Sequence, residues 1–398
     1  MDRRGWGGVA LCAGIVISGL AVPAAAKAKP KPLPSRVFVQ TNDPGANAVR
    51  VFNRRKNGQL VRGKSYPTGS TGGGSLVAAT PFPFTESQGS VTLSRDGRLL
   101  FVTNHGGNAV TSFRVTRRGL RRVSTVPSGG VAPLSVTVHP SRRLAYVVNE
   151  GNPATISGFT FNSRGALRPL SNSTRTLAYP AGAPAQISFT PSGKALVVSD
   201  RHSGPGVGQD HIETFRVGRQ GRPTALRPTL ATGETPFGFA FTKNDVLVMT
   251  YAGNDRSNAG GVGTYTAADN GKLTRVRSRA TKQTATCWIV ITKNQKLAFL
   301  SNTLSVSISA YRISRGGALR GANNHPAVTG VQGAPVELAL SRDSKFLYAV
   351  NVDPTIIFRD PKARSDIEIF KVGKGGALTS IDTAGSGLPT SVSGIAVW

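Results

Sequence analysis

An aromatic residue followed six positions later by glycine recurs seven times along this chain, at intervals of roughly 45 to 60 residues. In six of the seven copies a Leu follows the glycine by one or two residues. This pattern predicts a strand that ends in a buried aromatic, a tight turn in which glycine takes a positive φ, and a second strand. Because the copies share one spacing, the whole chain is expected to repeat one supersecondary unit. The pairs are Phe52/Gly58, Phe113/Gly119, Phe159/Gly165, Phe215/Gly221, Tyr265/Gly271, Tyr311/Gly317 and Phe370/Gly376.

A second pattern precedes each aromatic residue: a short alternating strand, a polar turn and a strongly apolar strand, as in residues 91–104. Each unit therefore holds four short strands, and no helical periodicity is seen. We expect an all-β fold, a seven-bladed β-propeller of four-stranded antiparallel blades. A tandem β-sandwich is the alternative, which seven in-register pairs disfavour. Residues 395–398 match a first strand and residues 37–42 a second strand, so the two chain ends should complete one blade and close the ring.

The N-terminus has the features of an export signal. Arg3 and Arg4 precede the apolar stretch 9–22, and Ala24–Ala26 offers a cleavage site. We therefore expect a signal peptide at 1–26, a Lys/Pro linker at 27–35 and the propeller at 36–398. The expected location is secreted or cell-envelope associated, with no transmembrane segment after signal removal. Such a mature chain keeps one cysteine, Cys287, and so has no internal disulfide.

Several blocks of the chain resemble the lactonase-type seven-bladed propellers, which group bacterial 6-phosphogluconolactonases with carboxymuconate cyclases. They are residues 94–104 (SRDGRLLFVTN), 144–150 (LAYVVNE) and 341–351 (SRDSKFLYAVN). The resemblance covers about residues 36 to 398. It implies a lactonase-type hydrolase or cyclase. We predict no cofactor. We find no GxSxG elbow, P-loop or dinucleotide fingerprint.

His105 and Glu150 each follow a second strand in neighbouring blades, which places them where they can converge as a general acid/base pair around a lactone carbonyl. The resemblance implies a role for Glu150 in particular, because family members carry a Glu in the same Val-Asn-Glu setting. The chain also departs from the family. Residues 132–135 (APLS) replace a Gly-Pro-Arg-His stretch, and residues 87–90 (SQGS) replace another His-rich stretch.

Polar side chains next to the expected inner strands are candidates for substrate binding at the mouth of the central channel. They are Gln186, Glu337, Trp288 and Ser135, together with His202 in a neighbouring loop. The alternative is that these groups satisfy hydrogen bonds of the channel itself. The stretch 200–211 contains Asp and His residues that a loop could gather around a metal, or that form a solvated polar loop; we predict no metal site.

The formal net charge is +30, and most of it falls in the turns that a propeller places on one face. Such a face should attract a polyanion such as an anionic envelope polymer, without specific nucleic-acid recognition because no stacking aromatics accompany it. We expect a monomer. Two function classes follow: a lactonase-like enzyme, or a non-catalytic propeller that binds a small ligand or an anionic polymer. The acidic residues in these turns are Asp96, Asp245, Asp269 and Asp343; the basic ones include Arg54, Arg55, Lys56, Arg117, Arg118, Arg121, Arg122, Arg142, Arg143, Arg275, Arg277, Lys293 and Lys296.

Overall fold

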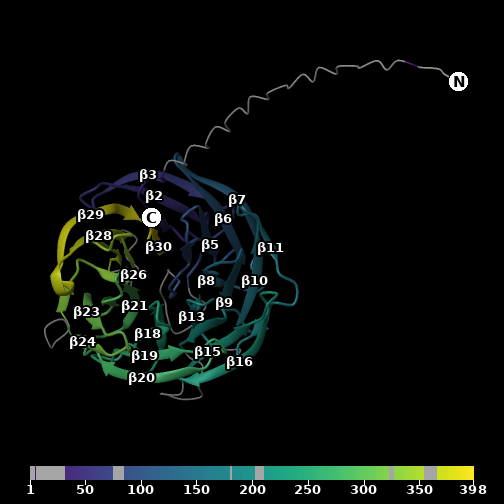
Figure 1. Ribbon diagram of the computed structural model, residues 1–398. Helices are drawn as coiled ribbons and strands as arrows, with labels where there is room; N and C mark the ends of the chain where they lie inside the picture. The colour runs from purple at the N-terminus through teal and green to yellow at the C-terminus, as the bar shows by residue number, and fades with distance from the viewer. Residues whose placement is uncertain are drawn as a thin grey trace. The chain divides into compact units, whose positions relative to one another are not determined.

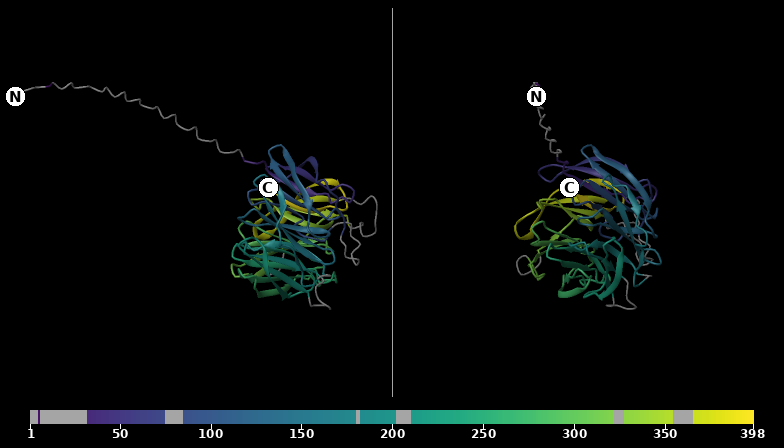
Figure 2. Two further views of the ribbon diagram at one scale, coloured as in Figure 1. Left: turned by 90° about the vertical axis from the view of Figure 1, so that its right-hand side faces the viewer. Right: turned by 45° about the vertical axis from the view of Figure 1, so that its right-hand side comes forward.

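Seven antiparallel sheets are arranged as blades around a central axis in the computed structural model (Figures 1 and 2). The structure describes residues 5, 32–74, 85–179, 182–201, 210–321, 327–353 and 365–398. Residues from Leu33 to Trp398 form one compact unit. The expected signal peptide lies outside the described residues except for Gly5. The predicted seven-bladed propeller is confirmed.

Within each blade the strands are given below from the innermost to the outermost, and neighbouring strands are antiparallel. Blade 1 has β30 (Ser393–Val397), β1 (Arg36–Gln40), β2 (Ala48–Arg54) and β3 (Leu60–Pro67); blade 2 has β4 (Val91–Leu93), β5 (Leu99–Asn104), β6 (Ala109–Thr116) and β7 (Gly119–Pro127); blade 3 has β8 (Pro133–Val138), β9 (Leu144–Asn149), β10 (Thr155–Phe161), β11 (Leu167–Pro169) and β12 (Arg175–Thr176). Blade 4 has β13 (Pro184–Phe189), β14 (Ala195–Asp200), β15 (His211–Val217) and β16 (Pro223–Leu230); blade 5 has β17 (Pro236–Phe241), β18 (Val246–Tyr251), β19 (Gly261–Ala267) and β20 (Leu273–Ala280). Blade 6 has β21 (Thr286–Ile291), β22 (Leu297–Asn302), β23 (Ser307–Ile313), β24 (Leu319–Gly321) and β25 (Ala327–Gly330); blade 7 has β26 (Ala334–Leu340), β27 (Phe346–Val352), β28 (Ser365–Val372) and β29 (Leu378–Leu388), with the 3₁₀ turn η2 (Lys374–Gly376).

The inner strands form an unbroken ring, since each contacts the inner strand of the next blade from β4 through β26 and β30 back to β4. The ring is closed in blade 1, where Val37 of β1 pairs with Val397 of β30. Arg36 and Trp398 exchange two backbone hydrogen bonds of 3.0 and 2.8 Å. The predicted closure by the two chain ends is confirmed.

The repeated aromatic residues lie on the third strand of every blade and are at most 1% exposed. The paired glycines have φ between 84° and 137°, which explains why glycine is needed at these turns. The aromatic rings pack between neighbouring blades: Phe159 of blade 3, for example, shares a core with Phe101 of blade 2 and Val147 of blade 3. The hydrophobic core is therefore divided among the interfaces between blades.

Two blades depart from the expected unit in their outer strands. In blade 3 the outer strand is divided into β11 and β12, which pair separately with β10, and in blade 6 it is divided into β24 and β25, which pair separately with β23. Pro169 ends β11, and proline has no N–H for a continuing ladder. The described residues contain no helix that is long and apolar enough to cross a membrane.

The two faces of the ring are built from different connections. We call the loop face the one formed by the connections between second and third strands and between blades. The turn face is the opposite one, formed by the turns between first and second strands and between third and fourth strands. The second strand of each blade therefore ends at the loop face, where the candidate site lies.

Candidate functional site

Three charged or titratable residues occupy the same position in three consecutive blades, directly after the second strand. His105 follows β5, Glu150 follows β9 and Arg201 follows β14. The structure brings the three together: His105 Nε2 lies 3.1 Å from Glu150 Oε2, and Arg201 Nη2 lies 3.2 Å from Glu150 Oε1. The side chains are only 2% to 3% exposed. His105 and Glu150 thus meet as the strand spacing predicts, with a guanidinium on the other carboxylate oxygen.

A fourth member, Glu86, comes from the segment that leads into β4. Its Oε2 lies 2.9 Å from Arg201 Nη1, while Arg201 Nε donates to the carbonyl of Ala183 at 3.1 Å. Burial lowers the pKa of Arg201, but the carboxylates of Glu86 and Glu150 outweigh burial and raise that pKa above its usual value. The guanidinium is therefore permanently charged and fully occupied. Its place is to hold two carboxylates rather than to bind a substrate anion.

The segment Thr85–Ser90 crosses the space inside the ring of inner strands. The Thr85 hydroxyl lies 2.6 Å from that of Ser393 in β30, and the Ser87 hydroxyl donates to the Leu134 carbonyl of β8. The Gln88 side chain makes two hydrogen bonds, of 3.0 and 2.9 Å, to the backbone of Ile289 in β21. The segment therefore ties several blades together and positions Glu86.

The candidate substrate-binding residues on the inner strands use their polar groups on the protein itself. Ser135 donates to the Gln88 carbonyl at 2.7 Å, and the Trp288 indole donates to the Ser87 carbonyl at 2.8 Å. Gln186 makes hydrogen bonds of 3.0 and 2.6 Å with the backbone of Phe239 in the next blade. All three residues therefore satisfy hydrogen bonds within the channel, which is the alternative given in the sequence analysis.

Glu337 differs from the other inner-strand residues. It lies on β26, is 3% exposed, and its Oε2 has no hydrogen-bond partner among the described residues. Burial raises the pKa of this carboxyl well above its usual value, although the backbone N–H groups of Gly89 and Leu338 oppose the shift. Burial therefore favours the neutral form of the Glu337 carboxyl over the charged one.

His202 lies outside the described residues. Tyr179 precedes it and His211 follows it in the sequence, and these two rings stack with their centroids 4.5 Å apart. The His211 ring nitrogen Nε2 also lies 3.1 Å from the Tyr179 hydroxyl. Within the described part of the chain, no group of three His, Cys, Asp or Glu side chains is arranged to hold a metal ion.

Arg201 and Glu86 were not among the residues expected from the sequence. Arg201 carried a usable signal, because it follows its second strand as His105 and Glu150 follow theirs. Glu86 carried none, since it lies outside the repeated strand patterns, in the connection that leads into β4.

Comparison with known proteins gives the same fold. A family model described as a lactonase seven-bladed β-propeller matches residues 135–291 and 262–389. The uncharacterized protein YwcC of Lactococcus lactis is 25% identical over 214 residues, which are 52% of this chain. The matched region spans 59% of YwcC, less than two thirds of that relative's length.

Two solved structures share the fold at low identity. The Pseudomonas aeruginosa periplasmic gluconolactonase has 16% identity and a TM-score of 0.69, with 91% of this chain and 98% of that chain covered. A Lactobacillus plantarum protein has 15% identity and a TM-score of 0.67, with 90% and 99% covered.

Proposed function

Because this chain belongs to the lactonase family of seven-bladed β-propellers, we propose that it hydrolyses or forms a lactone through His105 and Glu150 on the loop face. The observation that carries the proposal is the buried contact of 3.1 Å between His105 Nε2 and Glu150 Oε2. A carboxylate on one imidazole nitrogen fixes the tautomer and leaves the other nitrogen to accept a proton.

In this proposal the Nε2–H group of His105 donates to Glu150, and Nδ1 accepts a proton from water. The water oxygen bonds to the lactone carbonyl carbon, the ring C–O bond breaks, and the leaving alkoxide takes the proton back from Nδ1. The Glu150 carboxylate stabilises the imidazolium that forms in between. Lactone formation is the same sequence in reverse. Arg201 is a positioning residue, since its contact at 3.2 Å fixes the Glu150 carboxylate.

The test compares the Glu150→Gln variant with the wild type on a sugar lactone such as glucono-δ-lactone. Hydrolysis is measured as proton release above the spontaneous rate. We expect kcat to fall by about 10²- to 10⁴-fold, because the amide neither stabilises the imidazolium nor fixes the tautomer. Glu234→Gln is the matched control, since Glu234 pairs with Arg256 elsewhere on the loop face. Full activity in Glu150→Gln would remove this carboxylate from the mechanism.

A second candidate, a non-catalytic propeller that binds a small ligand, is favoured by one observation. The His105 and Glu150 side chains are each 3% exposed, which also suits a purely structural network. A wild-type protein that hydrolyses none of a panel of five- and six-membered lactones would support this class. Thermal-shift measurements with the same lactones then detect binding, because a ligand at 100 times its Kd stabilises by about 2.7 kcal/mol.

Export is part of the proposal. It is supported by Arg3, Arg4 and the apolar stretch 9–22 ahead of Ala24–Ala26. N-terminal sequencing of the protein recovered outside the cytoplasm should start near Lys27, whereas an intact N-terminus on cytoplasmic protein would contradict export.

A further inference from the structure

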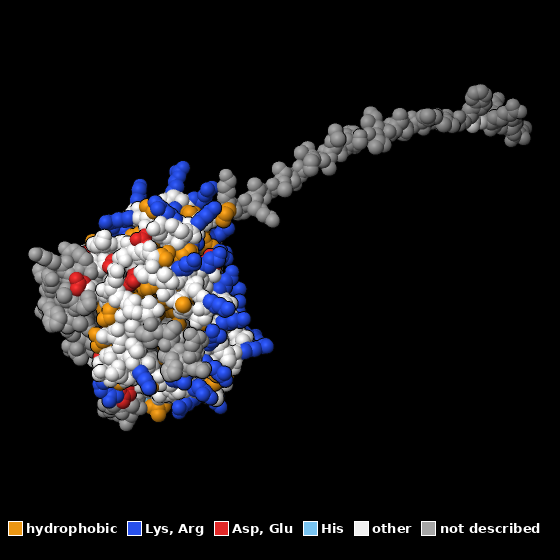
Figure 3. Space-filling model, turned by 90° about the vertical axis from the view of Figure 1, so that its left-hand side faces the viewer, with side chains coloured by type: hydrophobic (Ala, Val, Ile, Leu, Met, Phe, Trp, Pro, Cys, Tyr) orange, Lys and Arg blue, Asp and Glu red, His pale blue; other side chains and the backbone are white. Residues whose placement is uncertain are grey.

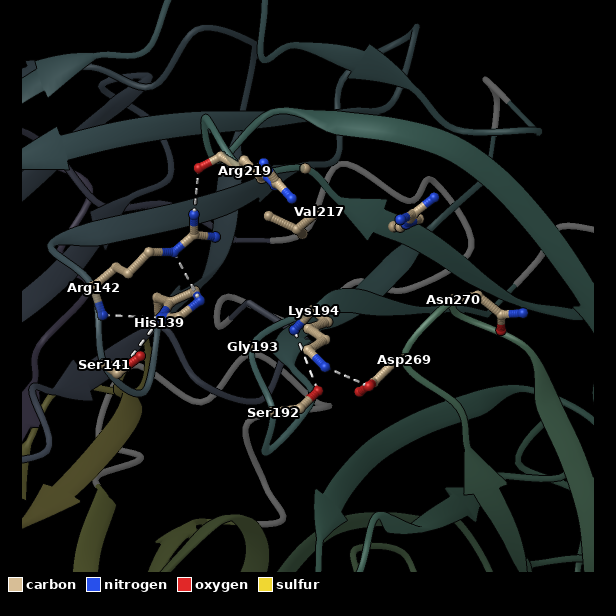
Figure 4. A pocket seen from close by; sticks show the side chains of 12 residues that line it. His139, Ser141, Arg142, Ser192, Gly193, Lys194, Val217, Arg219, Asp269 and Asn270 are labelled. Carbon is tan, nitrogen blue, oxygen red and sulfur yellow. Dashed lines mark hydrogen bonds and ion pairs between the residues drawn. The ribbon is translucent and has the colours of Figure 1, made fainter.

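Three grooves recur on the turn face, each between neighbouring blades. The groove drawn in Figure 4 has a volume of about 740 Å³ and lies between the turns of blades 3, 4 and 5. Its basic residues are Arg142, Lys194, Arg216 and Arg219, and its one acidic residue is Asp269. Figure 4 shows Arg142 reaching from its turn to the Arg219 backbone, at 2.9 Å. The groove is thus lined by residues of three blades, and its cations come from blades 3 and 4.

The other two grooves repeat this arrangement. One, of about 600 Å³, lies between blades 5, 6 and 7 and has four basic residues and no acidic one. The other, of about 400 Å³, lies between blades 2 and 3 and has four basic residues and Asp96. The basic residues are Lys296, Arg312, Arg315 and Lys374 in the first, and Arg95, Arg98, Arg142 and Arg143 in the second.

Little of this charge is neutralised within the protein. Among the described residues, the ion pairs of the turn face are Lys194–Asp269 at 2.6 Å and Arg98–Asp96 at 3.9 Å. Lys and Arg side chains gather along the right-hand edge of the ring in Figure 3. Burial, helped by the positive charge of Arg142, lowers the pKa of His139 in the first groove to about 4. The grooves therefore present positive charge that is available to an external anion.

The positive charge also extends beyond the turns, which corrects part of the sequence analysis. Arg121 and Arg122 lie within β7, and Arg275 and Arg277 within β20, rather than in turns. The positive charge therefore extends from the turn face onto the outer strands of blades 2 and 5. The grooves themselves remain bounded by the turn residues.

We propose that the turn face binds a flexible phosphodiester polymer, with the repeated basic grooves each receiving phosphate groups. This inference is independent of the proposed lactonase activity on the opposite face. Arginine and lysine attract phosphate, and several equivalent grooves allow one chain to bind at several points. Neither of the two larger grooves is lined by Phe, Tyr or Trp. Single-stranded nucleic acids gain affinity by stacking their bases on aromatic side chains, which these two grooves lack, so a polymer without bases fits better.

The experiment measures binding of poly(glycerol phosphate) by sedimentation or fluorescence anisotropy across a salt series. If six to ten phosphates are bound, affinity should fall by about 10³- to 10⁵-fold between 50 and 200 mM salt. The test variant reverses four exposed groove residues that have no side-chain hydrogen bond among the described residues: Arg216→Glu, Arg219→Glu, Arg315→Glu and Lys374→Glu. The matched control reverses four exposed residues away from the grooves, on outer strands and the loop face: Arg227→Glu, Arg277→Glu, Arg279→Glu and Lys282→Glu.

The groove variant should lose at least about 10-fold more affinity than the control variant, which carries the same change in net charge. Equal losses in both variants would overturn the proposal, since the grooves would then have no special role. Tighter binding of single-stranded DNA or of anionic phospholipid vesicles at equal phosphate concentration would also overturn it. Lactone hydrolysis should be the same in all three proteins, so a failure here is separable from a failure of the proposed function.

Discussion

A single arginine organises the charged cluster on the loop face. Arg201 is 2% exposed and lies between two carboxylates, Glu86 at 2.9 Å and Glu150 at 3.2 Å. Its guanidinium carbon also lies 5.5 Å from the centre of the Phe237 ring. Each carboxylate is buried only because the guanidinium compensates it. The geometry of the His105–Glu150 pair therefore depends on Arg201, which holds the other oxygen of the Glu150 carboxylate.

Arg201→Met should destabilise the fold by about 3–5 kcal/mol, because it removes the guanidinium that compensates the buried carboxylates of Glu86 and Glu150. Adding Glu86→Gln to this variant should restore part of the loss, since one uncompensated charge is removed. The measurement is urea unfolding of the wild type, both single variants and the double variant. Arg256→Met is the control: its side chain is 61% exposed, and loss of its pair with Glu234 should cost less than about 1 kcal/mol. A loss as small as the control's would show that Arg201 is dispensable.

At the scale of elements, the strands were predictable and the segment between blades was not. The buried aromatic residues and positive-φ glycines, such as Phe113 and Gly119, repeat because every blade packs a third-strand aromatic ring in the core and follows it with a tight turn. The meeting of His105 and Glu150 followed from their equal positions after second strands. Segment 85–90 leads into the first strand of blade 2, and its hydrogen-bond partners come from distant parts of the chain. For example, Gln88 bonds to Ile289, 201 residues away. Local pattern contains no information on such a contact.

The two hydrogen bonds of Gln88 to Ile289 predict a stabilising role for this segment. Gln88→Ala should lower the free energy of unfolding by about 2–4 kcal/mol, because it leaves a backbone N–H and a carbonyl of β21 without their partner. Chemical denaturation measures the change, with Gln220→Ala, at an exposed turn position, as the control. The control should change stability by less than about 0.5 kcal/mol. Similar stabilities for both variants would mean that water replaces the Gln88 amide.

At the scale of the whole molecule, the ring depends on both chain ends. β30 lies between β1 of its own blade and the inner strands β4 and β26 of the neighbouring blades. It therefore links the first and last parts of the chain in a single cooperative structure. Without β30, β1 would present an unpaired edge, and the inner ring would be open at one position.

Deleting residues 393–398 should abolish cooperative folding of the entire propeller rather than loosen one blade, because every blade is stabilised through its two neighbours. Calorimetry should show one transition in the wild type and none, or a strongly lowered one, in the truncated chain. A circular permutant is the matched control. It joins Trp398 to Arg36, which exchange backbone hydrogen bonds, through a short glycine-rich linker, and it opens the turn between β21 and β22. All strand pairs are kept in that chain, so it should melt as one unit within a few degrees of the wild type. A truncated chain that melts like the wild type would show that pairing of β30 does not close the ring energetically.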